Sequence, residues 1–159
     1  MFPALNGPKF QFECKDFNAL SIKELYHILQ LRQDIFVVEQ NCPYLDCDGK
    51  DLDSLHLCYY DKGELLAYAR LIPEGISYTS YSSIGRVVCV KALRGTGLAK
   101  ALMRTALDIM LNRFGAIPIK ISAQLYIKKF YQDLGFKAVG EEYLEDDIPH
   151  QAMIYHFDS

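Results

Sequence analysis

Residues 87–100, VVCVKALRGTGLAK, decide the fold of this chain. The apolar residues from Val87 to Val90 predict a buried strand, and the apolar spacing that begins at Leu98 predicts a long helix. Gly95 and Gly97 lie between the two and predict a tight turn, because glycine adopts backbone angles that other residues avoid. A strand, a glycine turn and a helix are therefore expected in direct succession.

The start of this predicted helix has the chemistry of an anion site. The first N–H groups of a helix have no partner inside the helix, and they lie at the positive end of its dipole. Arg94 and Lys100 flank the turn and add positive charge. A pyrophosphate would suit this turn, although a glycine turn that only connects a strand to a helix fits the residues equally well. The glycine spacing matches neither the dinucleotide fingerprint nor the Walker loop.

Apolar periodicity on both sides of this stretch predicts the other elements. Ser21 and Glu24 form a capping-box pattern, and the helix that follows should run to about Glu39. A loop rich in aspartate is expected at Asn41–Ser54. The other expected elements are strands at Phe10–Cys14, Leu55–Tyr60, Glu64–Ile72, Ser83–Val90, Ile117–Ser122, Lys137–Tyr143 and Ala152–Phe157, and helices at Leu98–Ile109 and Gln124–Leu134.

The order of these elements predicts an α/β (mixed α+β) fold. Strand–helix–strand units in the second half favour parallel pairing there, and the hairpins before and after them favour antiparallel edges. The expected result is a twisted, mostly antiparallel mixed sheet with helices on both faces. At about 150 residues per domain, residues 1–159 should form a single domain.

Composition excludes several classes of function. The formal net charge of −3 argues against nucleic-acid binding, and the longest apolar run, Leu65–Ala69, is too short to span a membrane. Met1–Ala4 resembles no export signal, and the cysteine count of five is odd, so we expect reduced thiols and a cytoplasmic protein. Cys42 and Cys47 lie near two aspartates, but the spacing suits no metal, and no metal is expected.

Several stretches resemble the GNAT acyltransferases. Residues 94–99, RGTGLA, match the Arg/Gln-x-x-Gly-x-Gly/Ala signature of that family, and Phe130–Phe136 resembles its tyrosine-bearing helix that ends in Gly-Phe. The resemblance is to the ElaA-like branch and covers about residue 20 to the C-terminus. The stretches that carry it are Leu31-Arg32, Phe36–Tyr44, Ala67–Arg70, Ile84–Val88 and Ile148–His150.

The resemblance implies binding of acetyl-CoA at the glycine turn. In GNATs the strand before the turn splays from the next strand, here Ile117–Ser122, to give a central splayed parallel pair. The turn amides then bind the pyrophosphate, and the unpaired backbone of the strand binds the pantetheine arm. The implied cofactor-binding residues are Val88, Val90, Arg94, Gly95, Thr96, Gly97, Leu98, Ala99, Lys100 and Gln124.

The expected chemistry is transfer of an acetyl group to a primary amine. A neutral amine needs a base, and the departing thiolate needs an acid. Tyr131 occupies the family position of the acid, although simple packing is the alternative. The strand before the turn has Arg86 where many GNATs have a glutamate, so Glu39 and His56 are the candidate bases. Cys89 lies on a buried strand, which favours direct attack in a ternary complex over an acyl-enzyme.

Three polar residues are candidates for the acceptor side. Arg70 and Arg86 lie inside predicted strands, where they either pair with carboxylates of the two acidic stretches, 46–53 and 141–147, or bind a substrate carboxylate. His150 is expected in a charged loop as a substrate contact. The acceptor is expected to be a small-molecule or peptide amine, and the protein a monomer or homodimer.

Two other functions remain open at this point. A non-catalytic acyl-CoA-binding or interaction module is compatible with the missing strand glutamate. An acyl-homoserine-lactone synthase-like enzyme shares the fold, but the absence of tryptophan removes one of its motif residues.

Overall fold

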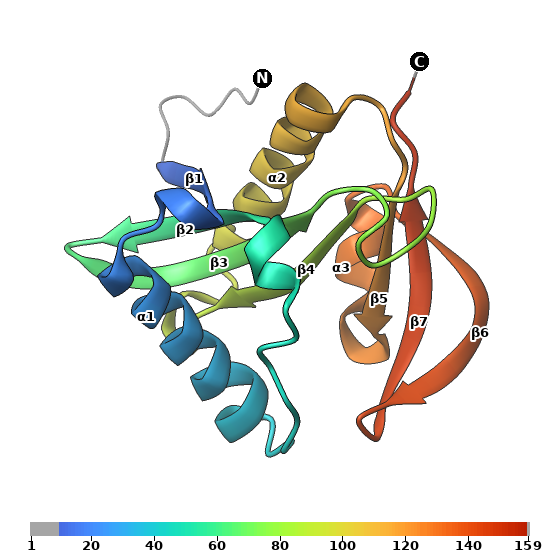
Figure 1. Ribbon diagram of the computed structural model, residues 1–159. Coiled ribbons are helices and arrows are strands. Elements are labelled where there is room, and N and C mark those ends of the chain that lie inside the picture. Colours follow the sequence, from blue (N-terminus) through green and yellow to red (C-terminus); the bar gives the residue numbers. More distant parts are fainter. Residues whose placement is uncertain (1–9, 159) are drawn as a thin grey trace.

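A computed structural model describes residues 10–158, so the expectation about Met1–Ala4 lies outside the described residues. The strands form two sheets that lie next to each other, with helices packed around them (Figure 1). The strands are β1 (Phe12–Asp16), β2 (Leu55–Asp61), β3 (Glu64–Ile72), β4 (Ser83–Cys89), β5 (Ile119–Gln124), β6 (Lys137–Glu145) and β7 (Ile148–Tyr155). The helices are α1 (Ile22–Arg32), α2 (Leu98–Phe114) and α3 (Lys128–Asp133), with short helical turns at η1 (Phe17–Ala19), η2 (Gln33–Glu39), η3 (Lys50–Asp53), η4 (Lys91–Leu93) and η5 (Leu125–Ile127).

The first sheet has the order β1-β2-β3-β4 and is antiparallel throughout. Its β2–β3 hairpin turns at Lys62 and Gly63, both of which have positive φ angles, 53° and 80°. Positive φ at both central residues is the geometry of a tight hairpin turn. The hairpin predicted between these two strands is confirmed.

Two helices cover opposite faces of this sheet, as predicted. Tyr68 of β3 is fully buried against Ile28 of α1, whereas its neighbours Ala67 and Ala69 belong to the cluster formed with Leu102 of α2. Successive side chains of a strand point to opposite faces, so the two helices lie on opposite faces of β3. Figure 1 shows α1 in front of the sheet and α2 behind it.

The second sheet has the order β5-β7-β6 and corrects one expectation. Parallel pairing was expected along the second half of the chain, but β7 lies antiparallel between β5 and β6 and separates them. Within residues 10–158, the parallel pairing found is a bridge from Ser82, just before β4, to Ile119 of β5. The α/β fold class, mostly antiparallel with a parallel pair at its centre, is confirmed.

Two of the predicted helices differ from the observed ones near one end. The capping box is present, with the N–H of Glu24 donating to Ser21 Oγ at 3.0 Å, and the helical path does reach Glu39. The last seven residues, Gln33–Glu39, are wound as a π-helix. The helix expected at Gln124–Leu134 begins only at Lys128, because Gln124 still pairs with β7 as the last residue of β5.

The last hairpin is longer than expected. The loop predicted between Tyr143 and Ala152 is mostly strand, since β6 continues to Glu145 and β7 begins at Ile148. Only Asp146 and Asp147 form the turn, with φ angles of 50° and 63°. Acidic residues and a proline hid this strand from sequence reasoning, because they are uncommon in strands. His150 is therefore a strand residue and not a loop residue.

Candidate active site between the two sheets

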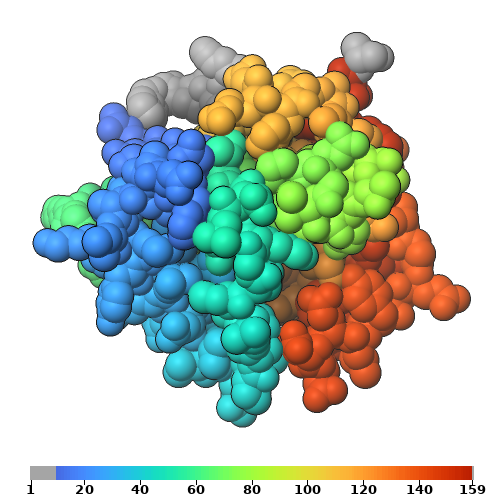
Figure 2. Space-filling model, in the orientation of Figure 1, coloured from blue at the N-terminus to red at the C-terminus, as the bar shows by residue number. Residues whose placement is uncertain are grey.

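β4 and β5 diverge from their single bridge and leave a cavity between the two sheets. At the bridged end, the N–H of Lys120 donates to Ser82 O at 2.9 Å, and the Ser83 hydroxyl donates to Lys120 O at 2.7 Å. Beyond these bonds lies a cavity of about 400 Å³, lined along both strands. Figure 2 shows the surface hollowed between the segment around residues 40–54 and the β6–β7 hairpin. The splayed parallel pair expected from the family resemblance is present.

The lining divides the predicted site residues into two groups. Glu39, Arg86, Val88, Arg94, Ala99, Gln124, Tyr131 and His150 line the cavity. His56, Arg70, Val90, Gly95, Thr96, Gly97, Leu98 and Lys100 do not line it. The turn residues of the second group still lie next to it, because Arg94 and Ala99 on either side of them do line it.

A bulge in β4 opens this strand toward the cavity. The register of β4 against β3 shifts between Tyr68 and Arg70, and Arg86 has a φ of 49° at this point. A bulge of this kind bends a strand and interrupts its ladder. Arg86 thereby comes to line the cavity, while its guanidinium bonds to Asp46 of the 41–54 loop.

The backbone of β4 corrects the assignment of Val88 and Val90. The N–H of Val90 donates to Leu66 O at 2.9 Å, so it faces β3 and is already bonded. Val88 lies two residues earlier, opposite Tyr68, and its backbone groups face β3 as well, because hydrogen-bonded pairs alternate along an antiparallel ladder. The backbone of Cys89 faces β5 instead, and its carbonyl accepts from Arg94 Nε at 3.2 Å.

The turn before α2 leaves backbone donors without side-chain caps. Gly95 and Gly97 have φ angles of 83° and 91°, and no side chain caps the helix at Gly97. The N–H of Thr96 is taken by Leu93 O at 3.3 Å. The first bond inside the helix runs from Ala101 to Gly97, so the N–H groups of residues 98–100 have no partner within α2. These donors suit an anion at the start of a 17-residue helix.

Arg94 and Glu39 form an ion pair at the edge of the cavity. Arg94 Nη2 lies 2.8 Å from Glu39 Oε2, and both side chains are about two-fifths exposed, at 42% and 37%. The pair joins the end of the π-helix to the glycine turn. Arg94, expected as a free phosphate contact, and Glu39, expected as a base, are thus bound to each other.

Tyr131 reaches the cavity from α3. It packs edge-on against Phe130 and Phe136, with ring centroids 5.2 and 5.7 Å away, and it is 7% exposed. Burial raises the pKa of its hydroxyl, which therefore stays protonated at neutral pH. Within residues 10–158 its hydroxyl has no hydrogen-bond partner. Tyr131 therefore packs with its ring and keeps a hydroxyl that is free to bond to a ligand.

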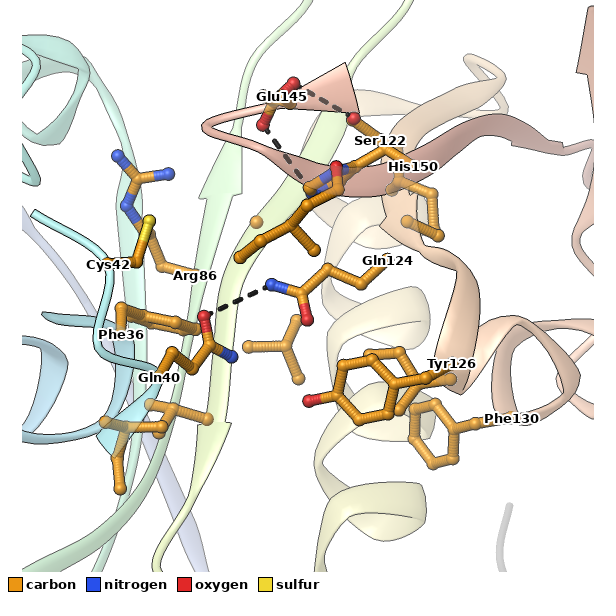
Figure 3. Close-up of a pocket in the computed structure, with 18 of the residues that line it drawn as sticks. Phe36, Gln40, Cys42, Arg86, Ser122, Gln124, Tyr126, Phe130, Glu145 and His150 are labelled. Carbon is orange, nitrogen blue, oxygen red and sulfur yellow. Dashed lines mark hydrogen bonds and ion pairs between the residues drawn. The ribbon is translucent and has the colours of Figure 1, made fainter. Parts of the chain in front are cut away.

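The second sheet presents a polar wall, which we define as Ser122, Gln124, Tyr143, Glu145 and His150. All of these except Tyr143 line the cavity. Gln124 and Tyr143 both pair with His150 across the sheet, and cross-strand partners share a face. Ser122 and Glu145 lie two residues away from these partners, on the same face. Figure 3 shows Ser122, Glu145, His150 and Gln124 together on one side of the cavity.

Hydrogen bonds tie this wall together and link it to the opposite side. The Ser122 hydroxyl is bonded to the Tyr143 hydroxyl and lies 3.2 Å from Glu145 Oε1. Across the cavity, Gln124 Nε2 donates to Gln40 Oε1 at 3.4 Å, as the dashed line in Figure 3 shows. Gln40 and Cys42 were missed by sequence reasoning, because only the π-helical turns bring them to the cavity.

Arg70 and Arg86 belong to an arginine–aspartate network, which consists of Arg32, Arg70, Arg86, Asp46, Asp48 and Asp51. Arg70 Nη1 lies 2.7 Å from Asp48 Oδ1 and 3.0 Å from Asp51 Oδ1. Arg86 Nε lies 2.8 Å from Asp46 Oδ1. Of the two roles left open for these arginines, pairing with the 41–54 loop is the one found.

His56 lies in the same region, and both of its ring nitrogens are hydrogen-bonded there. It is 1% exposed, its Nε2 lies 2.9 Å from Asp51 O, and its Nδ1 lies 2.6 Å from the Tyr68 hydroxyl. A carbonyl can only accept, so Nε2 carries the proton and Nδ1 accepts from the tyrosine. Burial lowers the pKa of His56 and keeps the ring neutral. His56 was wrongly expected at the site, and it has no free nitrogen to act as a base.

Two further findings concern the described part of the chain only. Within residues 10–158, no helix is long and apolar enough to cross a membrane. Among the same residues, no three histidine, cysteine or acidic side chains are grouped so that they could hold a metal ion.

A cavity between diverging parallel strands, with a glycine turn and an uncapped helix beside it, is the architecture of an acyl-CoA transferase of the GNAT type. Residues 44–157 match the family described as Acetyltransferase (GNAT) domain. The chain therefore belongs to the GNAT acetyltransferase family.

Individual relatives agree with this assignment. The protein ElaA of Escherichia coli is 43% identical over 136 residues, which cover 84% of this chain and 88% of ElaA. The crystal structure of ElaA superposes with a TM-score of 0.86, covering 92% of this chain and 99% of that structure at 39% identity. An acyl-CoA N-acyltransferase from Pseudomonas aeruginosa gives the same TM-score and coverage at 44% identity. The resemblance to the ElaA-like branch is confirmed.

Proposed function

We propose that this chain transfers the acetyl group of acetyl-CoA to a primary amine by direct attack in a ternary complex. The observation that carries the proposal is the cavity between β4 and β5, which meets the uncapped start of α2 at one end and the polar wall on one side. These are the surroundings that a pyrophosphate, a thioester and an amine each require.

The residues present fit coenzyme A. The N–H groups of Ala99 and Lys100, which lie in residues that are not buried, offer donors to a pyrophosphate, and the backbone of Cys89 faces the gap where a pantetheine arm would pair. Leu98 is fully buried and packs in the core. Acetyl-CoA, when bound, supplies the acetyl group as a reactive thioester.

Three groups of the chain support the transfer step. The N–H of Cys89, on the splayed side of β4, is positioned to donate to a developing oxyanion. The protonated Tyr131 hydroxyl is available to a departing thiolate. Burial raises the pKa of the Cys89 thiol, which favours direct attack over an acyl-cysteine intermediate.

A thiol-release assay tests the proposal. Purified protein with acetyl-CoA should release free thiol when given one of a panel of amines: ethylamine, 1,4-diaminobutane, phenethylamine or a dipeptide with a free α-amino group. Thermal stabilisation by acetyl-CoA without turnover of any amine would instead favour a non-catalytic acyl-CoA-binding module. Turnover that requires S-adenosylmethionine and an acyl donor would favour the lactone synthase-like activity.

A further inference from the structure

His150 is the one histidine of the described chain that lines the cavity. It lies in the middle of the polar wall, paired with Gln124 of β5 on one side and with Tyr143 of β6 on the other. The side chain is 6% exposed, and its ring stacks on Tyr143 with centroids 6.1 Å apart and planes 21° from parallel. Two strands and a stacked ring thus hold the imidazole in one orientation.

A backbone carbonyl fixes the tautomer of this imidazole. His150 Nδ1 lies 2.6 Å from Ile148 O, and because a carbonyl oxygen can only accept, Nδ1 carries the proton. In the neutral ring Nε2 then has the lone pair. This is the opposite tautomer from that of His56, whose Nε2 is bonded to a carbonyl.

The lone pair on Nε2 is not consumed by the protein. Within residues 10–158, the polar atom found near it is Glu145 Oε2, at 3.8 Å, which is beyond hydrogen-bond distance for a neutral ring. If the ring takes up a proton, the same carboxylate lies close enough to stabilise the imidazolium. Proton abstraction requires a base whose lone pair is unbonded in the neutral form and whose charged form is stabilised by a nearby group.

The other titratable and charged groups around His150 come from every side of the cavity. Tyr143 and Glu145 face it from β6, and Asp146 from the hairpin turn. Across the cavity lie Arg86 on β4, and Glu39 and Cys42 on the segment after α1. Arg86 is paired with Asp46, and Glu39 with Arg94. Glu145 is therefore the charge that acts most directly on the imidazole.

From this arrangement we infer that His150 is the general base of the reaction, an inference that rests on the proposed function. Nε2 takes a proton from the amine as the new C–N bond forms, and the C–S bond of the thioester breaks. The thiolate takes a proton from the Tyr131 hydroxyl, so the products are an amide and a free thiol. Exchange with water then removes the proton from His150 and restores the one on Tyr131.

The tautomer can be measured without any substrate. In a long-range nitrogen–proton NMR spectrum of the imidazoles at neutral pH, the ring signal that disappears in His150→Asn should be that of a ring protonated on Nδ1. Protonation of this ring on Nε2 in place of Nδ1 would overturn the inference.

Kinetics then separate a base from a structural residue. His150→Asn keeps a donor for Ile148 O, and His150→Gln places an amide near Nε2, but neither can accept the proton. Both should lower kcat about a hundredfold or more with the best amine of the panel while binding of acetyl-CoA is unchanged. The control His156→Gln alters an exposed histidine that does not line the cavity, and it should match the unmodified protein.

The same two variants also distinguish failure of this inference from failure of the proposed function. Wild-type turnover in His150→Asn and His150→Gln would refute His150 as the base and leave the acyltransferase proposal intact. Failure of the unmodified protein to bind acetyl-CoA would refute the proposed function itself, and the NMR tautomer would still decide whether His150 has the state that we infer.

Discussion

Two polar regions of this protein are built from similar residues but differ in how completely those residues are bonded. In the arginine–aspartate network, Arg32 is fully buried with Nε 2.8 Å from Asp46 and Nη1 2.7 Å from Asp51, and His56 beside it uses both ring nitrogens. In the polar wall, the lone pair of His150 has no hydrogen-bond donor among the described residues. The first region holds a loop on the sheet, whereas the second leaves bonding capacity for a ligand.

This difference has an energetic basis. A buried charge is tolerated only when its partners satisfy it, and removing one partner leaves an expensive orphan. Each aspartate of the network contacts two arginines, which holds the 41–54 loop on the sheet, whereas Arg70 Nε is buried without a hydrogen-bond partner among residues 10–158. A polar group that opens on a cavity can do without a hydrogen-bond partner from the protein, because water can bond to it until a ligand arrives.

The largest effect should come from breaking the network at its buried centre. Arg32→Ala removes one of the two arginine partners of both Asp46 and Asp51 and should lower the free energy of unfolding by about 3–5 kcal/mol. Urea denaturation measures this change. Lys129→Ala removes an exposed ion pair with Asp133, with side chains 84% and 54% exposed, and should leave the midpoint nearly unchanged. Equal midpoints for the two variants would show that the network is not a unit of stability.

On the cavity side, Tyr131→Phe should act on rate and not on stability. The ring packing is kept and only the hydroxyl is lost, so kcat should fall about a hundredfold, equivalent to about 2.7 kcal/mol, while the affinity for acetyl-CoA hardly changes. Steady-state kinetics with calorimetric binding separate the two quantities. Equal rates in both proteins would mean that Tyr131 only packs.

A smaller effect should appear when the network is titrated. Burial raises the pKa of Asp48 and Asp51, but hydrogen bonds from Arg70 and Arg32 outweigh it, so both pKa values lie below the usual range. Their stabilisation is complete above the ordinary pKa of aspartate, about 3.9, and is lost as the pH falls below it.

Unfolding by urea at pH 7 and pH 3 measures this loss. Arg70→Met removes a cation that lies 2.7 Å from Asp48, so the variant should be less stable at pH 7 and should lose less on acidification than the unmodified protein. The expected difference is on the order of 1–2 kcal/mol. An identical loss in both proteins would show that these aspartates do not govern acid stability.

The two regions also differ in how far the sequence predicted them. The glycine turn, the flanking helices and the splayed strands followed from residues 87–100 and from the family resemblance, because turn chemistry and apolar periodicity are local signals. Pairing of Arg70 and Arg86 with acidic side chains was foreseen as one of two roles, but not which of the two acidic stretches would provide the partners. The direction in which the backbone groups of Val88 and Val90 point was not predicted. It depends on which residues of β4 form hydrogen-bonded pairs with β3, and the sequence alone does not show this.

The polar wall was the hardest part to predict. The β6–β7 hairpin has Glu145, Asp146 and Asp147 where strand patterns are sought, so its residues were expected to form a loop, with His150 as a substrate contact in it. His56, by contrast, lay in a clear strand and was wrongly placed at the site. Which histidine faces the cavity depends on tertiary pairing between β5, β7 and β6, which no local pattern reports.

Calorimetric titration with coenzyme A tests the central claim, that the turn before α2 holds the diphosphate, most directly. Gly97→Ala and Gly97→Glu carry the same strain at φ 91°, and neither has an atom within 4 Å of the new Cβ, so they differ only in the added side chain and its charge. We expect one molecule bound per chain in the unmodified protein, weaker binding in Gly97→Ala and none in Gly97→Glu. Equal affinity in the two variants, or no heat with the unmodified protein, would contradict the account.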